Sequence, residues 1–211
     1  MKQITYLHSN AAIGEQIEVL KHIRSNSKNI AIYQRDIDQL AQDLNHLAAR
    51  QIDCRATGDA KSIIASVKDY LKEECLPDAL LIQDIQTLLR HFEAITQASS
   101  FRLALKTVST NMCRKFHTDV NELRMLCTYI GAGTLWLPDE AIEVVVGGEG
   151  SGKMTVDKEK IQQAQAGDVL ILKGALYPDA NPILHQSPAI EEKAEKRLLL
   201  RIDINSSFGD L

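Results

Sequence analysis

Apolar and polar or small side chains alternate over the stretch Phe101-Arg102-Leu103-Ala104-Leu105-Lys106-Thr107-Val108. Such alternation is typical of a β-strand that buries one face in a core. Similar strand-like runs occur at 123–130, 134–137, 142–146, 168–172 and 197–204, with turns containing Gly, Pro or Asn between them. Short strands separated in this way predict an antiparallel barrel or jelly roll. We expect residues 99–211 to form this β domain.

Residues 1–98 have a different pattern. Apolar side chains keep helical spacing around 13–23, 37–47, 62–71 and 80–95. Two short extended pieces interrupt them, at 29–33 and 52–57. The sequence therefore predicts an α+β protein, in which a mainly helical region (1–98) packs on the β domain (99–211).

Composition limits the function classes. The chain has 211 residues, of which 45% are hydrophobic and 25% charged, and this excludes disorder and fibrous folds. A net charge of −4 without a basic face argues against nucleic acid as a partner. No apolar stretch approaches the roughly 20 residues of a membrane helix.

The four cysteines have no paired spacing, and the first residues have no signal-peptide core. We therefore expect reduced thiols, mostly buried, in a cytoplasmic protein that does not bind membranes. Edge strands and an amphipathic helical region permit a homodimer without requiring one.

The run Val144-Val145-Val146-Gly147-Gly148-Glu149-Gly150-Ser151-Gly152-Lys153-Met154 imitates a phosphate-binding loop. That loop needs Ser or Thr after Gly-Lys to bind Mg²⁺, and the thioether of Met154 does not serve a hard cation. The polar residues that follow do not predict a buried helix. We interpret 144–154 as a hairpin or lid loop.

His117-Thr118-Asp119 places two metal-ligating side chains on one face of an extended segment, with Cα atoms roughly 6.6 Å apart. A second imidazole, from His185, would complete a set of two histidines and one carboxylate. That set leaves coordination positions open on one side, as non-haem Fe(II) oxygenases require. Zinc accepts the same ligands. Alternatively, His117 and Asp119 form a surface pair and His185 is a loop residue.

Arg197 and Arg124 are candidates for binding an anion. Period-two spacing places Arg197 and Arg201 on one face of the last strand, and an arginine inside a small barrel is costly unless it meets an anion. The guanidinium of Arg197 would suit the distal carboxylate of 2-oxoglutarate. Alternatively, Arg197 and Arg201 are solvated arginines of an edge strand. Arg124 could contact a substrate anion or a second cosubstrate carboxylate, or form a surface ion pair instead.

The runs 113–119, 123–129 and 131–137, with Gly167-Asp168, Lys173-Gly174, 185–188 and 197–200, resemble a bacterial family of unknown function, number 1826. A looser pattern is similar to phytanoyl-hydroxylase-type 2-oxoglutarate oxygenases. It consists of HxD, a distal His followed by a small polar residue, and an Arg about a dozen positions later. The resemblance implies a double-stranded β-helix, Fe(II) on His117, Asp119 and His185, and 2-oxoglutarate held by Arg197.

Three functions follow as alternatives. The first is an Fe(II)- and 2-oxoglutarate-dependent oxygenase acting on a small molecule or another substrate that the sequence does not identify; its cofactor would perform the chemistry. The second is a cupin-like protein that binds zinc or another divalent metal without oxygenase activity. The third is a metal-free interaction module. For the first function, Tyr129, Thr134 and Trp136 are candidate pocket-wall residues; alternatively, each is a core residue.

Overall fold

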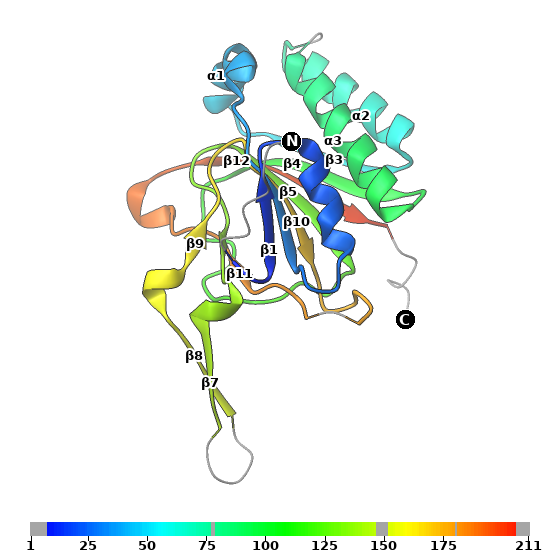
Figure 1. Ribbon diagram of the computed structural model, residues 1–211. Helices are drawn as coiled ribbons and strands as arrows, with labels where there is room; N and C mark the ends of the chain where they lie inside the picture. The colour runs from blue at the N-terminus through cyan, green and yellow to red at the C-terminus, as the bar shows by residue number, and fades with distance from the viewer. Residues whose placement is uncertain (1–7, 77–78, 147–151, 180, 206–211) are drawn as a thin grey trace, which may run out of the picture.

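One large sheet forms the centre of the molecule (Figure 1). The computed structural model of the chain describes residues 8–76, 79–146, 152–179 and 181–205. Within these residues the sheet has seven strands in the order β1-β2-β10-β5-β12-β4-β3. Only β1 and β2 pair in parallel. The strands are β1 (Ala11–Gly14), β2 (Ile30–Tyr33), β3 (Asp53–Gly58), β4 (Phe101–Val108), β5 (Leu123–Ile130), β10 (Val169–Lys173) and β12 (Arg197–Ile204).

A smaller sheet packs on one face of the large one. In the described part of the chain it contains β11 (His185–Gln186), β6 (Leu135–Trp136) and β9 (Gln162–Gln163), in that order. An isolated bridge between His117 and His185 extends it by one short segment. From β4 onward the chain crosses repeatedly between the large and the small sheet.

Helices cover the other face of the large sheet. Figure 1 shows α2 (Ala60–Glu73) and α3 (Leu80–Thr96) side by side, with α1 (Ala41–Ala48) above the sheet. Asp59 caps α2 by accepting a hydrogen bond from the backbone N–H of Ser62 at 2.7 Å. The buried carboxylate of Asp43 in α1 accepts from the N–H of Leu81 at 2.9 Å, and so caps α3 across a helix contact. The 3₁₀ segments are Ile17–Arg24, Asp38–Leu40, Asp139–Ala141, Lys158–Lys160 and Glu191–Lys193.

Each face of the large sheet has its own apolar core. The core under the helices includes Leu198, Leu200 and Ile202 of β12, as period-two spacing predicts. The core between the two sheets includes Leu126 and Trp136. The opposite face of β12, which carries Arg197, Leu199, Arg201 and Asp203, therefore turns toward the small sheet.

The predicted α+β class is confirmed at the level of a mixed protein with a large sheet. The sheet also crosses the boundary expected between residues 98 and 99, because β1, β2 and β3 precede it. The helix expected from residue 13 was wrong there. Ala11–Gly14 is a strand, and the helical segment starts at Ile17.

The segment that imitates a phosphate-binding loop contains an antiparallel hairpin, β7 (Ile142–Val146) with β8 (Gly152–Val156). Figure 1 shows this hairpin projecting from the body. A phosphate loop would need a helix after the first strand, so the hairpin prediction is confirmed. Residues 147–151, and with them any lid, lie outside the described residues.

All four cysteines are free thiols, as expected. Cys54 and Cys127 are buried, but Cys75 is exposed, so the expected burial was wrong for it. No helix within the described residues is long and apolar enough to span a membrane.

Gly174 follows β10 and supports the loop that carries Asp119. A Cβ at Gly174 would lie 2.1 Å from Asn121 Oδ1 and 2.8 Å from the Asp119 carbonyl oxygen. The adjacent Ala175 N–H donates to that carbonyl at 2.8 Å. Only glycine allows the two segments to approach this closely.

The Gly174→Ala variant is expected to lose about 1–3 kcal/mol of unfolding free energy, because the added methyl group forces the 119–121 loop outward. Urea denaturation measures the loss. Gly14→Ala is the matched control, since its Cβ would meet Val19 Cγ2 at an ordinary 3.4 Å. Equal stability of the two variants would contradict the prediction.

Candidate metal centre

Two chain segments far apart in sequence position the candidate ligands. His117 and His185 exchange backbone hydrogen bonds, each N–H donating to the other's carbonyl oxygen at 3.0 Å. His185 also pairs with Trp136 of β6. Asp119 lies two residues beyond His117, so its carboxylate reaches the same side of the bridge.

The structure brings the three predicted ligands together. One candidate ligand atom from each of His117, Asp119 and His185 lies within 4.8 Å of the others. Asp119 Oδ2 is 3.3 Å from Nε2 of His185, and Asp119 Oδ1 is 3.7 Å from Nε2 of His117. The exposed fractions of the His185, Asp119 and His117 side chains are 7%, 11% and 34%. The cluster is therefore closed on one side and accessible along His117.

The donor set fits a divalent transition metal. Two imidazoles and one carboxylate are ligands that iron and zinc both accept. Asp119 Oδ2 is buried beside Nε2 of His185, but the described residues give it no hydrogen bond of good geometry, so a bound cation would stabilise it. Burial acts to raise the pKa of Asp119, but His185, Arg124 and His117 outweigh it and hold that pKa below its usual range. The carboxylate is thus ready to bind a cation.

Arg124 is paired with two carboxylates of the chain, Asp119 and Asp203. Its Nη1 lies 2.6 Å from Asp119 Oδ1, while Nε and Nη2 donate to Asp203 at 2.6 and 3.2 Å. This arrangement assigns Arg124 to orienting Asp119, so that Oδ2 turns toward the histidines. Asp203 is a residue that the sequence analysis missed. Its position on the same face of the last strand as Arg197 was the available signal.

Asp203→Asn is expected to weaken zinc binding about tenfold, because Arg124 then faces Asp119 with less of its charge compensated. Isothermal titration of metal-free protein with zinc measures the effect. Asp53→Asn is the control, since Asp53 is an exposed carboxylate that pairs with Arg55 and Lys106. An Asp203→Asn affinity equal to that of the unchanged chain would show that the Arg124 network does not tune Asp119.

Arg197 is buried between the two sheets with an exposed fraction of 1%. Its Nη2 donates to the hydroxyls of Thr128 and Thr134 at 2.9 and 3.4 Å, and its Nε has no partner in the described part of the chain. None of the ion pairs formed by described residues neutralises it. Burial lowers the pKa of Arg197 to about 10, so the guanidinium stays charged at neutral pH. An anion placed beside this guanidinium and the two hydroxyls would neutralise the buried charge.

The other candidate wall residues divide between the two faces of the sheet. Thr134 contacts Arg197, as described above, and Trp136 pairs with His185 in the small sheet. Tyr129 belongs to the core under the helices and donates to Asp84 Oδ2 at 2.6 Å. Of the two expectations for Tyr129, the structure therefore supports the core residue.

Comparisons with solved structures find matches of low sequence identity. Dioxygenase for auxin oxidation 1 from Arabidopsis thaliana, in a 2-oxoglutarate complex, is 11% identical, covers 95% of this chain and 94% of its own, and has a TM-score of 0.46. A Pseudomonas putida prolyl-4-hydroxylase is 11% identical, with coverages of 88% and 95% and a TM-score of 0.42. A bsmA homologue from Methylobium petroleophilum is 10% identical, with coverages of 92% and 98% and a TM-score of 0.48. A search of curated proteins finds no match.

A family comparison covers almost the whole described chain. The profile described as "Protein of unknown function (DUF1826)" matches residues 14–203. This range includes the His117, Asp119 and His185 cluster, together with Arg124, Arg197 and Asp203. The chain belongs to the DUF1826 family.

Proposed function

We propose that this chain is an Fe(II)- and 2-oxoglutarate-dependent oxygenase built on a double-stranded β-helix. The repeated crossing of the chain between the large and the small sheet supports that architecture. The His117, Asp119 and His185 cluster would hold the metal, and it fits zinc as well as iron. The observation that carries the proposal is Arg197, because a metal-storage site has no use for a buried, unpaired guanidinium.

The residues of the chain would perform distinct tasks. Arg124, fixed by Asp203, holds Oδ1 of Asp119 and leaves Oδ2 free for the metal. Arg197, Thr128 and Thr134 would bind the distal carboxylate of 2-oxoglutarate and orient that acid within the core between the sheets. Leu126 and Trp136 exclude water from the same core. When bound, Fe(II) with 2-oxoglutarate and O₂ supplies oxidative chemistry that decarboxylates the 2-oxo acid and oxidises a substrate.

An anaerobic titration of metal-free protein with Fe(II) and 2-oxoglutarate tests the proposal. A visible metal-to-ligand charge-transfer band is expected only when both are added. His117→Ala is expected to abolish the band, because a metal ligand is lost. Arg102→Gln should leave it unchanged, since Arg102 is an exposed arginine of β4.

The titration also separates the alternatives. Zinc binding that depends on His117, without a band, would favour a cupin-like metal-binding protein without oxygenase activity. If neither metal binds, both the metal site and the oxygenase assignment fall, and a metal-free interaction module remains.

A further inference from the structure

A cavity lies on the face of β12 that turns toward the small sheet. Its volume is about 250 Å³, and β3, β4, β12 and the segment after β4 contribute to its lining. Leu199 and Arg201 line it from β12. Arg197 and Asp203 flank these two residues on the same face. The cavity is therefore placed between the proposed 2-oxoglutarate anchor and the network that holds Asp119.

The charged side chains that line this cavity are all cationic. They are Arg55, Lys106 and Arg201. Strand register places Arg55 and Arg201 on either side of Ala104, and Lys106 opposite Leu199, so the three cations occupy two neighbouring rungs of the sheet.

Carboxylates outside the lining compensate these cations only in part. Asp53 lies 2.7 Å from Arg55 Nε and 3.7 Å from Lys106 Nζ, so two cations share it. Asp203 lies 3.2 Å from Arg201 Nε but is already bound by Arg124. Arg201 Nε is buried without a hydrogen bond of good geometry. Capacity to bind an anion therefore remains.

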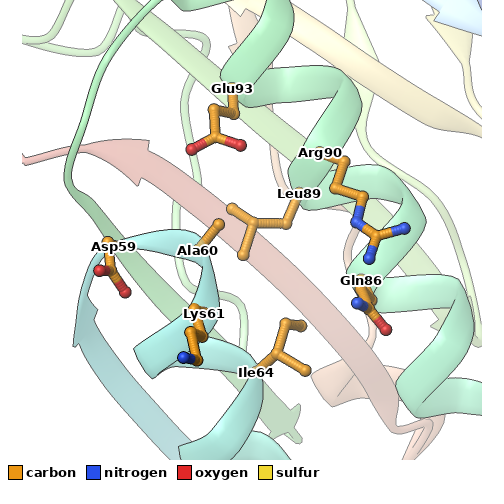
Figure 2. A pocket seen from close by; sticks show the side chains of 8 residues that line it. All are labelled: Asp59, Ala60, Lys61, Ile64, Gln86, Leu89, Arg90 and Glu93. Atoms are coloured by element: carbon orange, nitrogen blue, oxygen red, sulfur yellow. The ribbon is translucent and has the colours of Figure 1, made fainter.

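The cavity between α2 and α3 provides a contrast (Figure 2). Its charged lining residues are Asp59, Lys61, Arg90 and Glu93, which balance one another. Such a lining selects no sign of charge. The cavity between α2 and α3 thus lacks the excess of cations that lines the β-sheet cavity.

Apolar side chains form the remainder of the lining. Met112 is 51% exposed, which is high for a large apolar side chain. Val108 of β4 and Leu199 of β12 also line the cavity. An occupant that covers these three residues and meets the cations must combine an apolar body with an anionic group.

We infer that this cavity binds the oxygenase substrate, and that the substrate is a small organic anion, a carboxylate or phosphate group attached to an apolar segment. The inference that the bound anion is a substrate rests on the proposed function. The binding of such an anion can nevertheless be measured without metal or 2-oxoglutarate.

Hexanoate is a suitable probe, with hexylamine and 1-hexanol as cationic and neutral analogues of equal length. Metal-free protein labelled with ¹³C-methyl methionine reports binding through the Met112 signal, which Met112→Leu assigns. We expect a saturable shift of this signal with hexanoate and none with hexylamine. Met125 is fully buried in the core under the helices and should not respond.

Charge-removing variants locate the anionic group. Lys106→Gln and Arg201→Gln are each expected to weaken hexanoate binding about tenfold, because each removes a charge-assisted hydrogen bond. Arg102→Gln is the matched control. Arg102 lies on the same face of β4, four residues from Lys106, and does not line the cavity. The affinity of the Arg102→Gln variant for hexanoate should equal that of the unchanged chain.

Two results would overturn the inference. Equal shifts with hexanoate and hexylamine would show that the cavity does not select anions. A shift that Arg197→Gln abolishes and Arg201→Gln preserves would place the anion at the 2-oxoglutarate anchor instead. If no charge-transfer band forms, the oxygenase assignment is refuted, but hexanoate binding can still be observed. The failure of the proposed function and the failure of this inference are therefore distinguishable.

Discussion

His185→Ala is expected to weaken zinc and Fe(II) binding on the order of a thousandfold. His185 is the most buried of the three candidate ligands, and its Nε2 lies 3.3 Å from the buried Oδ2 of Asp119. Alanine leaves one imidazole and one carboxylate, too few donors to hold a metal against water. Competition with a chromophoric chelator measures the affinity.

His91→Ala is the control for this loss, because His91 lies in α3 and is not part of the cluster. Circular dichroism of both variants shows whether the fold is kept, since the backbone bridge at residue 185 does not depend on the side chain. Unchanged metal affinity in a folded His185→Ala variant would refute the metal site.

The strands that frame the site could be predicted closely from the sequence. The runs 101–108, 123–130 and 197–204 coincide with β4, β5 and β12. Their apolar side chains recur on the face under the helices and polar side chains recur on the other face, which produces a clear alternation. The strand β1 was not predicted. Ala11–Gly14 is too short to show the two-residue period of a strand, and its pairing with β2 depends on tertiary contacts.

Part of the candidate site could likewise be predicted from the sequence, and part of it could not. Spacing alone could place His117 and Asp119 on one side of an extended segment. The roles of Arg124 and Asp203 could not be predicted, because a residue pair 79 positions apart meets only through the register of β5 and β12. Thr128 was missed for a similar reason: its contact with Arg197 spans 69 positions.

Arg197→Met is expected to raise the unfolding free energy of the ligand-free protein by about 1–3 kcal/mol, while abolishing 2-oxoglutarate binding. Burial lowers the pKa of Arg197 to about 10, below its ordinary value. A cation whose pKa is lower in the folded state destabilises the fold at every pH below that value, so the full penalty is present at pH 7. Methionine has a similar length and carries no charge.

Thermal unfolding with and without 2-oxoglutarate separates the two effects. The unchanged chain should gain stability as 2-oxoglutarate pairs with the guanidinium, whereas Arg197→Met should start from a higher Tm and show no gain. Arg201→Met is the control, because its side chain is 43% exposed and its charge costs little. If Arg197→Met lowers the Tm, the guanidinium stabilises the fold through Thr128 and Thr134, and its burial no longer argues for an anionic cosubstrate. A higher Tm combined with lost binding would mean that the chain keeps a destabilising charge in its core because the cosubstrate requires it.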